Sequence, residues 1–148
     1  MDKIQLEKFI FEGLYEDVRE GDHTSLACIP VDDRSRAKLL VKAEGVIAGI
    51  EIAEAIFHHV DPSSVLDTRI QDGDDVQYGD VAFYVSCNTQ ALLKAERLVL
   101  NTMQRLSGIA TLSSRFAFEV EGLPVKILDT RKTTPVSYTH LDVYKRQM

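Results

Sequence analysis

The sequence predicts an α+β fold up to about residue 110, with strands first and helices on one side of them. Two observations favour this class. Residues 37–43 alternate apolar and polar side chains, which is typical of a strand with one solvent-facing side. Residues 92–106 place apolar side chains three and four positions apart, which is typical of an amphipathic helix. We therefore expect an open-faced sheet that helices cover on one face.

The first sixty residues predict two helices around that strand. Apolar side chains at steps of four predict a helix over residues 6–18, and Gly21 ends it. Residues 52–57 predict a second helix from the same kind of spacing. Gly45 and Gly49 bracket a tight apolar turn between the strand and this second helix.

Two further strands are expected over residues 65–70 and 81–85. The turns between them, at residues 71–74 and 77–80, are rich in Gly and Asp and resemble the hairpins of biotinyl and lipoyl carrier domains. A carrier hairpin needs a lysine at its exposed tip, and neither turn has one. We therefore interpret both as structural turns.

The remaining elements are a long helix, a second helix and a short strand. Asn88 or Thr89 is expected to cap the long helix, which runs to about Leu106. A separate helix is expected over about residues 112–120. The apolar run at residues 125–128 predicts a short buried strand after it.

Composition argues against several classes of function. The net charge of −6 makes the chain a poor nucleic-acid binder, so any anion site must be built from a few local cations. No apolar run approaches roughly 18 residues and no basic-hydrophobic leader starts the chain, so we expect a cytoplasmic protein without a membrane span. Cys28 and Cys87 are far apart and are expected as free thiols. The adjacent His58 and His59 would point about 100° apart on a helix, which favours helix capping over metal binding.

An Arg-Lys pair, Arg131-Lys132, follows the 125–128 strand. Ligands of α/β folds bind at the carboxyl ends of strands. A guanidinium matches a carboxylate or phosphate in bidentate fashion, and an ammonium adds a mobile point charge. The pair therefore indicates an anion site, with a solvated basic turn as the alternative.

Residues 129–135 read DTRKTTP and resemble the signature of the quinolinate phosphoribosyltransferases, also called nicotinate-nucleotide pyrophosphorylases (carboxylating). Three further segments resemble this family in the same order. They are the ED…GD.TS stretch at residues 16–25, the Gly-Val-Ile-Ala-Gly turn at 45–49 and the ER..LN….LSGIAT helix at 96–111. Four motifs in order make the resemblance specific.

The resemblance implies a domain organisation. Residues 1–110 would form the amino-terminal sheet-and-helix sandwich domain, and residues 111–135 would begin an α/β barrel of which only the first strand is present. Residues 136–148 match neither the family nor a clear period, and we expect them to be an artefactual tail outside the fold. The chain would then be the front part of an enzyme and inactive alone.

The resemblance also implies a reaction and a set of substrate-binding residues. The family joins quinolinate to phosphoribosyl pyrophosphate with Mg²⁺, releasing pyrophosphate and CO₂ to give nicotinate mononucleotide for NAD biosynthesis. Arg97 would reach into the partner's site of a homodimer and bind a substrate carboxylate. Thr130 and Arg131 would bind substrate, Arg131 at a quinolinate carboxylate, and Lys132 would face the phosphoribosyl side. The family's metal ligands have no counterpart in this sequence, so the resemblance assigns no metal site.

Alternatives remain at two levels. By composition alone, Arg97 is an ordinary surface arginine, and Glu96 beside it either orients it or lies on the surface. For the function, a related nicotinate-type phosphoribosyltransferase and a non-catalytic dimerisation module are the alternatives. The DTRKTTP run favours quinolinate as the substrate.

Overall fold

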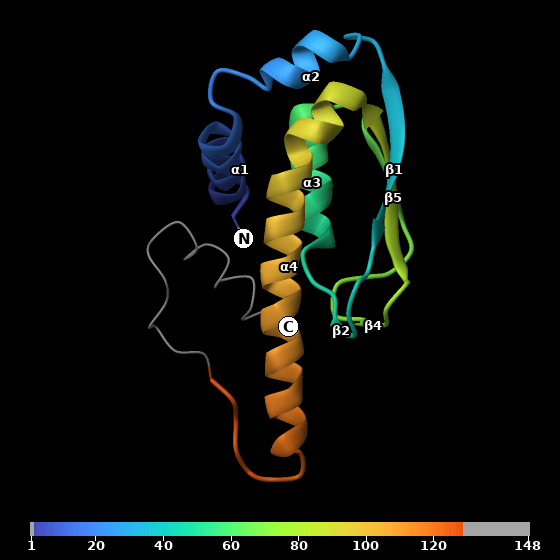
Figure 1. Ribbon diagram of the computed structural model, residues 1–148. Coiled ribbons are helices and arrows are strands. Elements are labelled where there is room, and N and C mark those ends of the chain that lie inside the picture. The colour runs from blue at the N-terminus through green and yellow to red at the C-terminus, as the bar shows by residue number, and fades with distance from the viewer. Residues whose placement is uncertain (1, 129–148) are drawn as a thin grey trace.

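A three-stranded antiparallel sheet with helices on one face forms the centre of the chain (Figure 1). The computed structural model describes residues 2–128. The sheet has the strand order β1 (Arg34–Leu40), β5 (Val81–Asn88), β3 (Val65–Thr68). A second, two-stranded pair is formed by β2 (Gly45–Val46) and β4 (Asp75–Val76).

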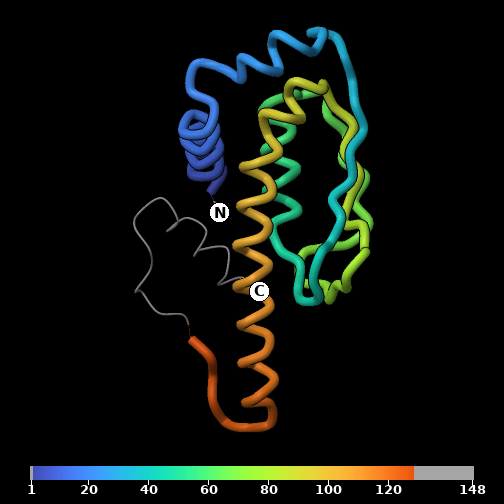
Figure 2. Tube along the Cα trace, viewed as in Figure 1, coloured from blue at the N-terminus to red at the C-terminus, as the bar shows by residue number. Residues whose placement is uncertain are grey.

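The helices lie in two layers beside the sheet. They are α1 (Lys3–Val18), α2 (His23–Cys28), α3 (Ile50–Val60) and α4 (Thr89–Glu119). Helices α3 and α4 pack side by side next to the sheet, and α1 lies against α4 on the side away from it (Figure 1). The distal half of α4 extends past the sheet, as the Cα trace shows (Figure 2).

The core forms where the periodicity places apolar side chains. On the central strand β5, Phe83, Val85 and Cys87 are buried, whereas Tyr84 between them is half-buried. Phe57 of α3 meets Phe83 edge to face, with ring centroids 6.3 Å apart. On the other face of the sheet, Arg36 lies over the Tyr84 ring at 4.6 Å. The alternation of β5 therefore confirms an α+β fold with one covered and one open face.

Asp61 joins the end of α3 to the start of α4. Its carboxylate accepts hydrogen bonds from the Ser63 backbone and hydroxyl, and from Asn88 N at 2.8 Å. These bonds, that of the Ser63 hydroxyl above all, hold the pKa of Asp61 below its usual range. Asn88 in turn caps α4 by accepting from Ala91 N at 3.0 Å, as predicted. Strand β5 runs on to Asn88, three residues beyond its predicted end, because its last residues pair with the start of β1.

Two predictions for the region after residue 106 are wrong. The expected break before a separate helix does not occur, because α4 is continuous from Thr89 to Glu119. Residues 125–128 are exposed and belong to no strand. A strand needs a neighbour for its backbone hydrogen bonds, and none lies beside these residues in the described part of the chain.

Smaller differences concern element ends and side-chain partners. Strand β1 ends at Leu40, where its pairing with β5 becomes irregular, and not at residue 43. His58 and His59 lie in the last turn of α3, which closes through Asp61 N–H to the Phe57 carbonyl, and His58 contacts the Ser64 hydroxyl at 3.0 Å. The short elements α2, β2 and β4 were not predicted.

Residues 2–128 bear on the expectations about metals, thiols and membranes. No group of three or more His, Cys, Asp or Glu side chains in this range could hold a metal ion. Cys28 is exposed, Cys87 is buried, and both are free thiols. Among these residues no helix has the length and apolar character that crossing a bilayer requires.

Candidate functional site

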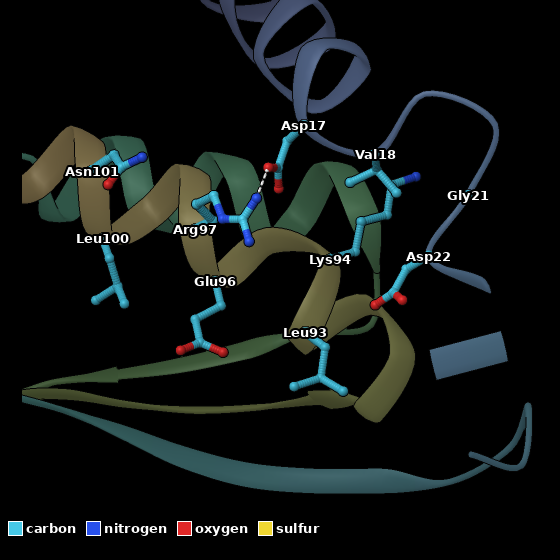
Figure 3. Close-up of a pocket in the computed structure, with 10 residues that line it drawn as sticks. All are labelled: Asp17, Val18, Gly21, Asp22, Leu93, Lys94, Glu96, Arg97, Leu100 and Asn101. Atoms are coloured by element: carbon cyan, nitrogen blue, oxygen red, sulfur yellow. Dashed lines mark hydrogen bonds and ion pairs between the residues drawn. The ribbon is translucent and has the colours of Figure 1, made fainter. Parts of the chain in front are cut away.

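A cavity of about 480 Å³ lies between the end of α1 and the first half of α4 (Figure 3). We call it the Arg97 pocket. It is lined by Asp17, Val18, Gly21, Asp22, Leu93, Lys94, Glu96, Arg97, Leu100 and Asn101. Five of the ten lining residues are ionisable, so the pocket suits a polar or charged ligand better than an apolar one.

Arg97 is held at this pocket by Asp17. Its Nη1 donates to Asp17 Oδ1 at 2.5 Å, and this pair of residues 80 positions apart joins α4 to α1 (Figure 3). The Arg97 side chain is 71% exposed and the Asp17 side chain only 22%. Glu96 points away from this pair (Figure 3), so the alternative that Glu96 orients Arg97 is wrong. The guanidinium of Arg97 is therefore accessible from outside the chain.

The periodicity of α4 explains why Arg97 faces the pocket. The predicted apolar stripe packs into the core through Ala95, Val99, Met103 and Leu106. Arg97 lies on a different side of the helix, together with Asn101 one turn later and Lys94 one turn earlier. Lys94 adds a second cation to the lining.

The turn between α1 and α2 forms the other wall of the pocket. Asp22 caps α2 by accepting from Ser25 N at 3.1 Å, and it also accepts from the Ser25 hydroxyl. The hydroxyl bond is the main reason why the pKa of Asp22 lies below its usual range. Ser25 is buried. The GD.TS part of the sequence therefore shapes the chain rather than offering free side chains.

The Gly-Val-Ile-Ala-Gly turn meets the LSGIAT part of the helix motif, outside the set of residues that line the pocket. Thr111 Oγ1 accepts from Val46 N at 2.9 Å, and Ser107 Oγ accepts from Ala48 N at 2.9 Å. Residues 45–49 and these two hydroxyls are called here the turn–helix contact. A side chain at Gly45, with φ of 155°, would collide with Thr111 Oγ1. The turn–helix contact has no room for a larger side chain at Gly45, and its two hydroxyls already bind backbone groups. Internal packing therefore explains why glycine, serine and threonine occur there.

The candidate site residues divide into those that the structure describes and those that it does not. Arg97 lies at the pocket as described above. Thr130, Arg131 and Lys132 lie outside the described residues, so their approach to a common site stays a prediction. Sequence analysis missed Asp17 and Lys94. The only signal for Asp17 was its place in the ED…GD.TS stretch, and nothing in the sequence pairs it with a residue 80 positions away.

Comparisons with known proteins identify the family that this chain resembles. A family model described as quinolinate phosphoribosyl transferase, N-terminal domain, matches residues 22–107. The chain is 46% identical over 124 residues to quinolinate phosphoribosyltransferase [decarboxylating] 1b of Nicotiana tabacum, covering 83% of this chain and 35% of that protein. It is 36% identical over 135 residues to the probable nicotinate-nucleotide pyrophosphorylase [carboxylating] of Bacillus subtilis, covering 91% and 46% respectively.

Solved structures agree with the sequence relatives. NadC from Streptococcus pyogenes superposes with a TM-score of 0.86 at 29% identity, covering 91% of this chain and 48% of that one. Nicotinate-nucleotide pyrophosphorylase from Ehrlichia chaffeensis gives 0.86 at 32% identity, covering 97% and 52%. The matched part thus spans about a third to a half of these relatives' length. These matches confirm the predicted resemblance and the α+β fold.

Proposed function

Since this chain belongs to the quinolinate phosphoribosyl transferase family, we propose that it supplies the amino-terminal domain of an enzyme that transfers a phosphoribosyl group to quinolinate. The products would be nicotinate mononucleotide, pyrophosphate and CO₂. The observation that supports a substrate-binding role within the described residues is Arg97. It is exposed, it lies at a pocket and it stands in the segment that matches the family model.

The chemistry of quinolinate suits these residues. Two adjacent carboxylates need several cations, and each charged hydrogen bond contributes roughly 1.5–3 kcal/mol. Arg97 would bind one carboxylate, with Lys94 beside it in the pocket. Arg131 and Lys132, which follow residues 125–128 in the sequence, would supply the remaining positive charges. Loss of CO₂ leaves electron density on a ring carbon, which a cationic pocket stabilises.

A homodimer is part of the proposal, with Arg97 acting in the partner's site. The exposure of Arg97 supports this, and so does the distal half of α4. Leu112, Phe116 and Phe118 are all more than half exposed there. Within residues 2–128 these side chains stay exposed, and a group of large exposed apolar residues on one helix suits an interface with a second copy.

Mg²⁺ and the location of the protein are further proposals. The three carboxylates of the Arg97 pocket do not converge on one point, because Asp17 pairs with Arg97, Asp22 caps α2 and Glu96 points away from the pair. We therefore expect Mg²⁺ to be held by residues beyond this domain. For the location we propose the cytoplasm, with an organelle as the alternative, since plant relatives are named mitochondrial and chloroplastic.

Turnover of quinolinate by the full-length protein tests the proposal. With phosphoribosyl pyrophosphate and Mg²⁺ present, we expect nicotinate mononucleotide to form. Arg97→Ala and Arg131→Ala should each lower kcat/KM roughly 30- to 1,000-fold, which corresponds to about 2–4 kcal/mol of transition-state stabilisation. Arg36→Ala, on the open face of the sheet, is the matched control and should leave kcat/KM unchanged.

Mixing the two inactive variants tests the shared site. In a heterodimer, one of the two sites regains both arginines, so part of the activity should return. If subunits exchange and no activity returns, Arg97 does not act in the partner's site. If the wild-type protein releases no nicotinate mononucleotide, the proposed reaction is wrong, and a nicotinate-type substrate or a dimerisation role takes its place.

A further inference from the structure

We propose that Asp17 is a positioning residue, which holds the guanidinium of Arg97 in the orientation that a substrate carboxylate requires. The inference rests on the proposed role of Arg97 as a substrate-binding residue. It adds a residue of α1 to a site that sequence motifs place on α4 and beyond.

The two partners differ in how firmly they are held. Asp17 stands in the last turn of α1, a helix that Ile10 and Leu14 fix in the core. Its side chain is mostly covered, whereas that of Arg97 is 71% exposed. A long exposed arginine samples many rotamers, and the conformational entropy that it loses when a ligand orders it weakens binding. Asp17 is therefore the fixed anchor, and Arg97 is the group that gains order.

The bond to Asp17 leaves Arg97 able to bind a second carboxylate. A guanidinium carries five N–H donors in a planar fork, and the bond to Asp17 uses Nη1. A carboxylate on another edge of the fork would meet donors already turned toward it. Holding a binding group in its productive geometry before substrate arrives is the general advantage of preorganisation.

The negative charge of Asp17 works against this gain, but less strongly. Two carboxylates on one guanidinium repel each other, and water and salt weaken that repulsion at a site this exposed. Lys94 lines the same pocket and supplies a second positive charge. The orienting effect should therefore prevail.

The other carboxylates of the pocket do not compete for this role. Asp22 accepts from the backbone and hydroxyl of Ser25. Glu96 points away from Arg97 (Figure 3). Of the three acidic side chains that line the pocket, Asp17 is the one bonded to the guanidinium.

Steady-state kinetics of the full-length protein provide the first test. Asp17→Asn should raise KM for quinolinate roughly 3- to 10-fold and leave KM for phosphoribosyl pyrophosphate unchanged, because a charged hydrogen bond at an exposed pair is lost. In the Arg97→Ala background the same change should have no further effect. Glu12→Gln is the matched control, since it removes an exposed carboxylate of α1 that pairs with Lys8 on the same helix.

A second test needs no activity. In the full 148-residue chain, nitrogen relaxation of the Arg97 Nε–H group should report restricted motion in the wild type and faster motion in Asp17→Asn. The inference is overturned by equal mobility in both, by a rise in kcat/KM for quinolinate in Asp17→Asn, or by additive losses in the double variant. If the wild-type enzyme shows no turnover, the proposed function and the substrate-binding part of this inference fall together, whereas the relaxation data still decide whether Asp17 orders Arg97.

Discussion

The Arg97 pocket and the turn–helix contact lie on the same helix, and they use their polar side chains in opposite ways. At the turn–helix contact, Ser107 and Thr111 bind backbone N–H groups of residues 45–49, of which Ala48 is fully buried. At the pocket, Arg97 keeps a largely exposed guanidinium. In one region the side-chain hydroxyls bind backbone groups of the same chain, and in the other a charged side chain stays largely exposed.

The comparison shows that a family motif is not by itself a list of ligand-binding residues. The ER..LN….LSGIAT segment contains both kinds of residue within 15 positions. Close packing around Gly45 and Gly49 explains why the turn–helix contact needs small and hydroxyl side chains. Arg97 has no comparable packing among the described residues, and its guanidinium bonds to Asp17 at the surface.

The largest expected loss of stability comes from Gly45→Ala. The substitution forces a side chain into a backbone region that glycine alone tolerates and displaces the hydroxyl that binds Val46. We expect the free energy of unfolding of the 148-residue chain to fall by about 2–4 kcal/mol in urea titrations. Gly73→Ala, with φ of 96° and open space around it, is the control and should cost less. Equal losses of stability for the two variants would mean that the Thr111 side chain moves aside at little cost.

Ser107→Ala should cost about 1–2 kcal/mol, because the buried Ala48 N–H loses its acceptor. Thermal unfolding of the chain measures the loss. Ser114→Ala, an exposed serine on the same helix, should change stability by less than about 0.5 kcal/mol. Arg97→Ala should also cost less than about 1 kcal/mol, since its ion pair is exposed. A loss for Arg97→Ala as large as for Ser107→Ala would contradict the distinction between the two regions.

Gly108→Ala should raise the free energy of unfolding, unlike the two substitutions above. Gly108 lies within α4, and a side chain placed there meets nothing within 4 Å. Alanine should therefore stabilise the chain by about 0.5–1 kcal/mol through helix propensity. Chemical unfolding of the variant and the wild type in parallel provides the measurement. Destabilisation would show that Gly108 has a packing role inside this chain.

The smallest expected loss of stability comes from protonation of Asp22 at low pH and should be confined to α2, which this residue caps. The folded pKa of Asp22 is lowered, so its stabilising contribution is present above the unfolded value near 3.8 and is lost as pH falls through the folded pKa. Amide shifts of Ser25 and Leu26, followed by NMR from pH 5 to pH 2, should report this transition. Asp22→Asn should abolish it, and Glu20→Gln should not. Shifts of Val46 and Ala48 should not follow the Asp22 transition, because hydroxyl groups bind them.

Sequence analysis predicted the fold well where burial is recorded in local spacing. The stripe on α4 and the alternation on β1 identified the covered and open faces, since side chains three, four or two positions apart share a face by geometry alone. The motif order identified the family and singled out Arg97, and the comparisons confirmed the family. The role of Arg97 remains a proposal.

The errors came from contacts between distant residues. Helix α4 continues past Leu106 where Ser107 and Thr111 bind a turn some 60 residues earlier in the chain. The apolar run at 125–128 was predicted as a strand, but a strand also depends on a neighbour that periodicity does not reveal.

The sequence by itself determined the fold class, the core-facing side of each long helix and the family of this protein. Only the tertiary structure decided that Asp17 is the partner of Arg97, that a pocket lies beside them, and that Ser107 and Thr111 bind the turn at residues 45–49. The physical reason is the sequence separation of the residues involved. Periodicity reports which side of one element is buried, whereas an ion pair or a backbone-to-hydroxyl bond depends on how separate elements meet.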